Sequence, residues 1–270
     1  MALIHPTAII EPGAQLDPSV TVGPFTTIGP HVRIAAGSTV GSHCVIQGHT
    51  TIGRDNTIHS HAALGAAPQD KKYAGEPTQL VIGDRNTIRE FCTFNAGTVS
   101  GGGVTRVGHD NLFMAYVHLA HDCQIGSHTI FANNAQLAGH VHVDDWVILG
   151  GFTVVRQFLR LGAHSFTAMC SLLFADLPPF VTCEGQPADA RTVNAEGLRR
   201  RGYSAERIAA VKAMHKLLYR ENLTLDVARQ RIAAIAGQTP EAQADVQMML
   251  DFLAGVGKSG IVRRRARSAA

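Results

Sequence analysis

Aliphatic residues recur at every sixth position over most of this chain. The first run is Ile10, Leu16, Val22, Ile28, Ile34, Val40, Ile46, Ile52, Ile58 and Leu64. The spacing returns at Ile82, Ile88 and Phe94 and, after a shift of one position, continues at six-residue intervals from Val107 to Leu161. An amphipathic helix repeats after about 3.6 residues and a half-buried strand after about two, so this period fits neither. We predict a solenoid in which each six-residue repeat is one short strand followed by a turn.

Glycine often follows the aliphatic residue, as at Gly23, Gly83 and Gly126. We expect the aliphatic side chain to point inward and the glycine to let the backbone bend where a side chain would clash. Three repeats then make one triangular coil, and stacked coils form three parallel sheets with about 4.8 Å between rungs. Each residue therefore lies next to the residue about 18 positions further along the chain.

Two segments interrupt the repeats, residues 66–80 and residues 96–105. Insertions in a solenoid form surface loops, and such loops tend to carry function. The alternative is that both are tolerated surface segments without a function.

A helical region follows the coil. The period fades after Leu161, and the composition changes after Gly185. We therefore predict a mainly β domain over residues 1–185 and a C-terminal α-helical domain over residues 186–270. Three helices are expected from their capping residues, the first running to about Tyr219. The predicted N-caps are Ser204, Thr224 and Thr239, the last followed by a proline.

Composition restricts the class of protein. The N-terminal residues contain neither a signal peptide nor a membrane span, so we expect a cytoplasmic protein. A net charge of +3 gives little reason to expect nucleic-acid binding. The cysteines number 5 and include no CxxC pair, which argues against a disulfide framework and a cysteine zinc site. The basic run at residues 263–267 is interpreted as a solvated tail.

The candidate chemistry lies in HLAHDC, residues 118–123, and in His140. A spacing of about 18 residues between rungs puts His121 next to Gly139 and Asp122 next to His140. Histidine can accept a proton near neutral pH, and a neighbouring carboxylate can orient its ring. The Gly139 N–H could stabilise the oxyanion of a tetrahedral intermediate. We therefore predict a general base at His121, oriented by Asp122.

Two other interpretations of the histidines exist. His118, His121 and His140 could be corner residues of the coil without a chemical role. They could also bind zinc, but such a site needs three or four convergent ligands. Nothing in the sequence identifies the third ligand, so we expect no metal site.

Five segments resemble the acyl-carrier-protein-dependent UDP-N-acetylglucosamine O-acyltransferases, which belong to the hexapeptide-repeat transferases. They are PQDKKYAGEPT (68–78), IGDRNTIRE (82–90), HLAHDC (118–123), ANNAQLAGHV (132–141) and NAEGLRRRG (194–202). The resemblance implies a left-handed parallel β-helix, which departs from the usual right-handed crossover. It also implies transfer of an (R)-3-hydroxyacyl group from acyl carrier protein to the 3-hydroxyl of UDP-N-acetylglucosamine, the first step of lipid A biosynthesis.

The same resemblance implies the partners. It predicts a cytoplasmic homotrimer with active sites between subunits and no cofactor of its own, because the donor is carried on the phosphopantetheine of acyl carrier protein. A coenzyme A-dependent acetyltransferase is the alternative enzyme, and a non-enzymatic scaffold is the alternative outside catalysis. The loop PQDKKYAGEPT and the long helical region favour the first interpretation over both.

The resemblance also assigns site residues. It gives His121 and Gly139 the catalytic roles already argued from stacking. The residues that it implies in substrate binding are Gln69, Asp70, Lys72, His118, His140, Arg156, Gln157, Asn194, Glu196, Arg200 and Arg201. Gln69, Asp70 and Lys72 would reach the sugar nucleotide from a neighbouring subunit, and the residues from Asn194 onward would contact uridine and diphosphate.

Three positions set this chain apart from the family pattern. Arg156 stands where the family often has histidine, so it can bind phosphate but cannot transfer a proton at neutral pH. Asn95 also replaces a frequent histidine and can only form hydrogen bonds. Met169 stands where the family shapes the far end of the acyl groove. We expect it to favour donors of about ten to twelve carbons over about fourteen, unless it merely packs inside the coil.

Overall fold

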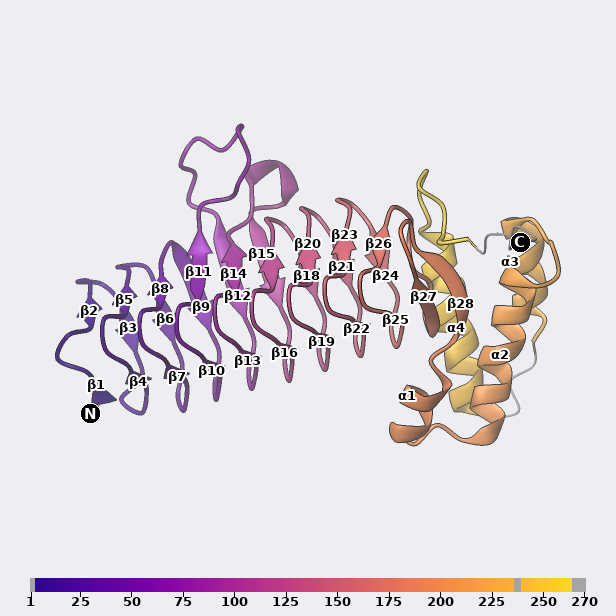
Figure 1. The fold of residues 1–270 in the computed structure, drawn as a ribbon, viewed down its shortest axis with the longest axis horizontal. Coiled ribbons are helices and arrows are strands. Elements are labelled where there is room, and N and C mark those ends of the chain that lie inside the picture. Colours follow the sequence, from indigo (N-terminus) through magenta and orange to yellow (C-terminus); the bar gives the residue numbers. More distant parts are fainter. Residues whose placement is uncertain (1–2, 236–238, 264–270) are drawn as a thin grey trace.

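The structure is a long coil of short strands that ends in a group of helices (Figure 1). It is a computed structural model, and it describes residues 3–235 and 239–263. The strands form three sheets, here named A, B and C. Sheet A contains β1 (Leu3–Ile4), β4 (Thr21–Val22), β7 (Thr39–Val40), β10 (Thr57–Ile58), β13 (Thr87–Ile88), β16 (Leu112–Phe113), β19 (Ile130–Phe131), β22 (Ile148–Leu149), β25 (Phe166–Thr167), β27 (Val181–Glu184) and β28 (Asp189–Val193).

The other two sheets are built in the same way. Sheet B contains β2 (Ile9–Ile10), β5 (Thr27–Ile28), β8 (Val45–Ile46), β11 (Ala63–Ala66), β14 (Thr93–Asn95), β17 (His118–Leu119), β20 (Gln136–Leu137), β23 (Val154–Val155) and β26 (Leu172–Leu173). Sheet C contains β3 (Gln15–Leu16), β6 (Arg33–Ile34), β9 (His49–Ile52), β12 (Gln79–Ile82), β15 (Val104–Val107), β18 (Gln124–Ile125), β21 (His142–Val143) and β24 (Arg160–Leu161).

The register confirms the stacking that the repeats predict. His118 pairs with Gln136 and Leu119 with Leu137, so neighbouring rungs are one 18-residue coil apart. The insertions lengthen two coils: 67–78 separates β11 from β12, and 96–103, which contains a 3₁₀ turn at Val99–Gly101, separates β14 from β15. Every described pairing between rungs is parallel except the last, where β28 runs antiparallel to β27. This hairpin crosses the boundary that composition suggested at residue 185.

The aliphatic residue of each repeat fills the interior of the coil. Ile28, Ile46 and Leu64 are fully buried, and the larger Phe113 and Phe131 rings occupy the same inward position further along. The glycines permit close approach between rungs. A Cβ added to Gly23 would lie 2.8 Å from the Gly41 carbonyl carbon, closer than real Cβ contacts. Glycine at this position therefore allows neighbouring coils to pack closely.

The chain turns at three corners of the coil, each named by the two sheets it joins. At corner BC stand Asp122, His140 and Phe158; at corner CA stand His128, Trp146 and His164; at corner AB stand Tyr116, Phe152 and Cys170. Each has a positive φ between 57° and 66°. Side chains at equivalent corner positions consequently stack in columns along the coil.

Three of the helices match the predicted ones. They are α2 (Ala205–Tyr219), α3 (Leu225–Ala233) and α4 (Pro240–Ala254), capped by Ser204, Thr224 and Thr239 as expected. A further helix among the described residues, the short α1 (Ala195–Arg200), is capped by Asn194 and stands outside the three predicted helices. The helices share a second apolar core that includes Leu198, Met214 and Phe252.

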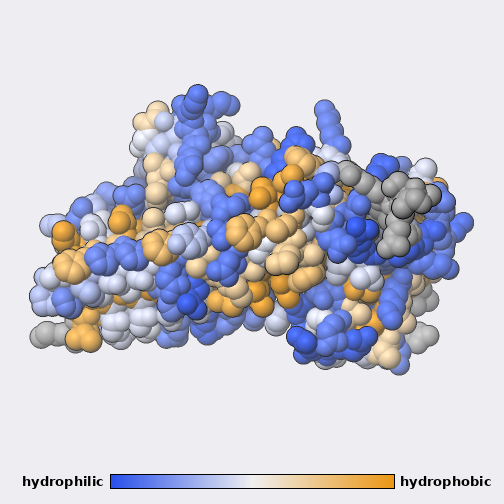
Figure 2. All heavy atoms as spheres, viewed as in Figure 1, coloured by the Kyte–Doolittle hydropathy of each residue, from blue (hydrophilic) through white to orange (hydrophobic). Residues whose placement is uncertain are grey.

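The surface differs between the coil and the helices. Figure 2 shows apolar side chains gathered on the coil towards its C-terminal half, whereas the helical end is mainly hydrophilic in this view. Among the described residues, no helix has the length and apolar character needed to cross a membrane. The described cysteines are free thiols, all buried except Cys170. The basic run at 263–267 lies outside the described residues from position 264 onward.

Candidate active site

Corner BC brings the predicted catalytic residues together. Asp122 and His140 occupy the same corner position in successive coils, and His121 and Gly139 directly precede them. The His121 and His140 rings lie edge to face, with centroids 5.0 Å apart. The vertical neighbours predicted from the repeat are therefore neighbours in space.

Asp122 is the fixed point of this site. Its side chain is only 1% exposed, and Oδ2 lies 2.8 Å from Nδ1 of His121. Thr98 donates to both carboxylate oxygens, from its backbone N–H to Oδ1 at 2.8 Å and from its hydroxyl to Oδ2 at 2.6 Å. The Asp122 N–H in turn donates to the Thr105 hydroxyl at 2.8 Å. A buried carboxylate with this many hydrogen-bond partners is held in one orientation.

Thr98 and Thr105 were not identified from the sequence as site residues. Both lie in the second predicted insertion, 96–105, which folds back over the carboxylate. Gly101 passes so close that a Cβ there would overlap the Asp122 carboxylate. The interruption of the repeats just before the histidines indicated a loop near the site. The six-residue repeat does not extend into that loop, so it could not predict which loop residue reaches Asp122.

Hydrogen bonding determines which nitrogen of His121 is available. Because the Asp122 carboxylate accepts a hydrogen bond from Nδ1, the neutral form of the ring carries its proton on Nδ1 and has its lone pair on Nε2. The His121 side chain is 15% exposed, so part of the ring is accessible from solvent. A histidine held by a carboxylate in this way can act chemically as a general base.

Gly139 lies against the His121 ring. A Cβ at this position would lie 2.6 Å from Cε1 and 2.8 Å from Nε2 of His121, so only glycine fits against the ring. Among the described residues, the Gly139 N–H has no hydrogen-bond partner, although its carbonyl accepts from Phe158 N–H. A free N–H beside the base can donate to an oxyanion.

The other two histidines differ in their surroundings. His140 stacks on Phe158 with centroids 4.4 Å apart, and its Nε2 lies 3.7 Å from Oδ2 of Asp122. His118 lies on the outer face of sheet B, where its Nδ1 is 2.7 Å from the Thr93 hydroxyl. Burial lowers the pKa of His118 from its ordinary value, so this ring is neutral at pH 7. His140 thus belongs to the carboxylate cluster and His118 to its edge.

These residues also bear on metal binding. His121, Asp122 and His140 offer ligand atoms within 4.8 Å of one another, so the structure supplies the third group that the sequence did not identify. Both oxygens of Asp122 are already used by Thr98, however, and the His121 contact has hydrogen-bond length. The described geometry suits a hydrogen-bonded pair better than a metal centre.

Two predicted substrate residues lie next to the His121 rung along corner BC. The register places Gln157 one rung beyond Gly139, and Arg156 precedes it; both are exposed. Met169 lies at corner AB and is 71% exposed, so the interpretation that it packs inside the coil is wrong. Phe152 at the same corner and Val154 on sheet B are also exposed, at 58% and 42%.

The remaining predicted residues are not gathered at this site within one chain. The loop that carries Gln69, Asp70 and Lys72 projects from the coil on the same side as the second insertion (Figure 1). Gln69 and Lys72 are exposed, and the Asp70 carboxylate accepts from the Lys72 N–H at 3.0 Å. Asn95, which is buried, donates to the Ala67 carbonyl at the base of this loop at 2.9 Å.

The α1 residues lie at the opposite edge of the molecule, beside corner CA (Figure 1). Asn194 caps the helix and donates to the His164 carbonyl. Glu196 pairs with Arg200, whose side chain is 78% exposed. Arg201 instead points to the coil, where it contacts His164 and the Trp146 carbonyl. A single chain therefore keeps the catalytic cluster and the α1 residues on different edges.

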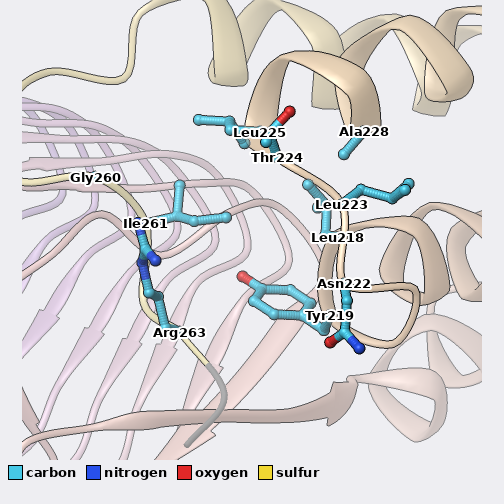
Figure 3. A pocket seen from close by; sticks show the side chains of 10 residues that line it. All are labelled: Leu218, Tyr219, Asn222, Leu223, Thr224, Leu225, Ala228, Gly260, Ile261 and Arg263. Atoms are coloured by element: carbon cyan, nitrogen blue, oxygen red, sulfur yellow. The ribbon is translucent and has the colours of Figure 1, made fainter.

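A separate hollow of about 490 Å³ lies between α2, α3 and residues 260–263 (Figure 3). Leucine and isoleucine side chains surround it, with Tyr219, Asn222, Thr224 and Arg263 as its polar members. Burial raises the pKa of Tyr219, so this hydroxyl stays protonated. The hollow does not include any of the residues at corner BC, and we assign it no part in the chemistry.

Comparisons with known proteins agree with this geometry. The family model described as "Udp N-acetylglucosamine O-acyltransferase; Domain 2" matches residues 176–262, and that described as "Bacterial transferase hexapeptide (six repeats)" matches 7–42 and 105–139. A curated acyl-[acyl-carrier-protein]–UDP-N-acetylglucosamine O-acyltransferase from Albidiferax ferrireducens is 70% identical over 202 residues, covering 74% of this chain and 76% of that protein. One from Thiobacillus denitrificans is 58% identical over 263 residues, covering 97% of this chain and all of that protein.

Solved structures give the same result. LpxA from Acinetobacter baumannii is 43% identical, with a TM-score of 0.92 and coverage of 97% of this chain and 100% of that one. The UDP-N-acetylglucosamine O-acyltransferase from Moraxella catarrhalis is 40% identical, with a TM-score of 0.92 over 96% of this chain and 99% of that one. The predicted left-handed parallel β-helix with C-terminal helices is confirmed.

Proposed function

The chain belongs to the acyl-[acyl-carrier-protein]–UDP-N-acetylglucosamine O-acyltransferase family and is an acyltransferase, and from this premise we propose the reaction that it performs. It transfers an (R)-3-hydroxyacyl group from acyl carrier protein to the 3-hydroxyl of UDP-N-acetylglucosamine, the first step of lipid A biosynthesis. The phosphopantetheine of the carrier protein holds the acyl group, so the enzyme needs no cofactor of its own. We place this reaction in the cytoplasm.

His121 begins the reaction as general base. Its Nε2 takes the proton of the sugar hydroxyl while the hydroxyl oxygen attacks the thioester carbonyl carbon. Asp122 stabilises the imidazolium that forms, and Thr98 keeps the carboxylate in place. The Gly139 N–H donates to the oxyanion of the tetrahedral intermediate. When the carbon–sulfur bond breaks, the imidazolium returns its proton to the leaving thiolate, which completes the ester and the free thiol.

One observation carries this proposal: a buried, hydrogen-bonded Asp122 aligns His121 beside the Gly139 N–H, which has no partner in the described part of the chain. In an acyl transfer, Asp122 would orient the ring, His121 would act as the base, and the Gly139 N–H would donate to the oxyanion. A structural solenoid would have no use for a partly exposed histidine that is held by a buried carboxylate next to a glycine.

The distribution of apolar side chains supports a homotrimer. The outward residues of sheet A towards its C-terminal half are apolar and only partly exposed: Leu112, Ile130, Ile148 and Phe166. Sheet B contributes Val154, and corner AB between the two sheets contributes Phe152 and Met169. The corresponding outward residues of sheet C are polar: Arg106, Gln124, His142 and Arg160. Association would therefore bury sheets A and B and leave sheet C in solvent.

Such packing also completes the site. When sheet B of one chain faces sheet A of the next, the interface is heterologous and closes as a ring. Corner BC of one chain then approaches corner CA and α1 of its neighbour. Asn194, Glu196, Arg200 and Arg201 of one subunit would thus join His121 of another, and Gln69, Asp70, Lys72, His118, His140, Arg156 and Gln157 would line the same cleft.

The test is a transfer assay with purified protein, UDP-N-acetylglucosamine and 3-hydroxyacyl carrier protein, run in parallel with acetyl coenzyme A. We expect acylation only from the carrier protein, and a product that mild alkali cleaves, because an ester hydrolyses where an amide does not. The 3-deoxy analogue of the sugar nucleotide should not be acylated. Transfer from acetyl coenzyme A with the carrier-protein donor inert would refute the proposal in favour of a short-chain acetyltransferase.

A further inference from the structure

His164, at corner CA, connects the coil to the C-terminal domain through both ring nitrogens. Its Nδ1 lies 3.1 Å from Nη1 of Arg201, and its Nε2 lies 3.0 Å from the Tyr203 hydroxyl. The ring stacks between Trp146 and Phe180, with centroids 6.2 and 5.6 Å away and nearly parallel planes. The residue is 7% exposed. Sequence reasoning did not identify it as a site residue.

The partners determine the protonation of this ring. A guanidinium can only donate, so Nδ1 must accept from Arg201 and the ring proton must sit on Nε2, facing the Tyr203 oxygen. Burial, together with the charges of Arg201 and Arg207, lowers the pKa of His164 to about 4. The imidazole is therefore neutral at pH 7 and keeps this one tautomer.

Arg201 is held in a single orientation by these contacts. Its Nη2 donates to the Trp146 carbonyl at 3.2 Å, and its guanidinium lies over the Trp146 ring, 5.0 Å from the centroid. A guanidinium has five N–H donors, and His164 and Trp146 use two of them, so others remain for an anion. Arg200, by contrast, is 78% exposed, and within residues 3–235 and 239–263 its side chain pairs with Glu196.

Tyr203 gives His164 a rigid support on its other side. The Arg207 guanidinium lies 3.5 Å from the Tyr203 ring centroid and forms two 2.8 Å hydrogen bonds with Asp245 of α4. The Asp245 side chain is 1% exposed. The His164 carbonyl also accepts from the Asn194 side chain at 3.2 Å, so the same residue anchors the start of α1.

We infer that His164 is a positioning residue of the nucleotide subsite, which orients the Arg201 guanidinium towards the diphosphate of the acceptor. The inference rests on the proposed function, since that assigns Arg201 to the nucleotide. His164 acts through Arg201 and Asn194 and does not itself touch the substrate. A preoriented guanidinium loses little freedom on binding phosphate, whereas an unsupported one must be ordered by the ligand.

Trp146 supplies the readout. It is the single tryptophan of the chain and lies against both Arg201 and His164, so nucleotide binding to Arg201 should change its fluorescence. Titrating the protein with UDP-N-acetylglucosamine then gives Kd directly. His164→Phe keeps an aromatic ring in the stack but has no acceptor, and we expect Kd to rise about tenfold. The kcat and the KM for the acyl donor should stay within about threefold of wild type.

His164→Asn is the matched control, because its amide oxygen can replace Nδ1 as the acceptor for Arg201. We expect it to recover most of the affinity lost in His164→Phe. If Phe destabilises the chain too much to be purified, His164→Gln takes its place, since its longer side chain reaches the Nε2 position and leaves Arg201 without its acceptor. Equal Kd for wild type and the variant that lacks the acceptor would overturn the inference.

A double-mutant cycle with Arg201→Ala separates positioning from a general structural role. We expect His164→Phe to change Kd less than about twofold when Arg201 is already absent. A full tenfold loss in that background, or an equal rise in the KM for the acyl donor, would show that His164 only supports the fold. If Arg201→Ala alone leaves Kd unchanged, the assignment of Arg201 to the nucleotide fails, while the acyl transfer at His121 still stands on its own assay.

Discussion

Gly139→Ala tests the catalytic geometry with a single methyl group. The added Cβ would lie 2.6 Å from Cε1 and 2.8 Å from Nε2 of His121, whereas ordinary contact begins at 3.4 Å. The ring must therefore retreat by about 0.8 Å. It cannot do so freely, because Nδ1 is bonded to Asp122 at 2.8 Å and Thr98 fixes that carboxylate. The methyl group thus displaces the base, and the Gly139 N–H is kept as an oxyanion donor.

The expected loss follows from that displacement. A reacting group moved by about 1 Å costs on the order of a hundredfold in rate, which corresponds to about 2.7 kcal/mol of transition-state stabilisation. Removing a general base altogether lowers the rate by a factor of roughly 10²–10⁴. The Gly139→Ala variant should therefore lose no more rate than a variant that lacks the base. Nucleotide affinity should change little, because no nucleotide contact has been assigned to Gly139.

The assay combines kcat for 3-hydroxyacyl transfer with the Kd for UDP-N-acetylglucosamine from Trp146 fluorescence. Gly151→Ala is the control, since its added Cβ would meet only the Asn133 carbonyl, at 3.3 Å. We expect it to keep at least about half of the wild-type kcat. A folded Gly139→Ala protein whose kcat stays within about threefold of wild type would refute the placement of His121 as base against this glycine.

Further predictions concern the base, the acyl groove, the acid response and assembly. His121→Ala should lower kcat by about 10²–10⁴ with nucleotide affinity nearly intact, and retention of more than about a tenth of the activity would exclude this base. Met169→Gly should shift the preference from donors of about ten to twelve carbons towards about fourteen, because each excluded methylene forfeits about 0.8 kcal/mol; competing the two donors measures this, and an unchanged ratio contradicts it. The folded pKa of His164, about 4, lies below the ordinary value of 6.5, so the unfolded chain takes up the proton first. The neutral His164 ring contributes its full share to the free energy of unfolding above pH 6.5, and this share declines as the pH falls towards 4. Urea denaturation should therefore give a free energy of unfolding that is about 2 kcal/mol lower at pH 5 than at pH 7 because of this group. The His164→Phe variant should lack this decline. Light scattering at micromolar concentration should report the mass of three chains, and a fully active monomer would be inconsistent with the shared site.

The sequence by itself determined whatever depends on counting along the coil. A constant number of residues per turn converts chain position directly into height, so the vicinity of His121 to Gly139 and of Asp122 to His140 could be predicted. The helices that begin at Ser204, Thr224 and Thr239 were also predictable, because a capping residue acts on backbone N–H groups within its own first turn. These are local or periodic relations, and neither requires knowledge of distant contacts.

The contacts of residues that do not follow the six-residue repeat were determined only by the tertiary structure. Thr98 reaches Asp122 because the insertion 96–103 folds back over the corner, and no repeat specifies the path of that loop. His164 meets Arg201 and Tyr203 across 37 and 39 residues because the helical domain docks against corner CA. The outward position of Met169 depends on which corner its turn occupies. Each of these contacts joins segments that share no register, so packing and hydrogen bonding had to select them from many arrangements that the sequence pattern alone permits.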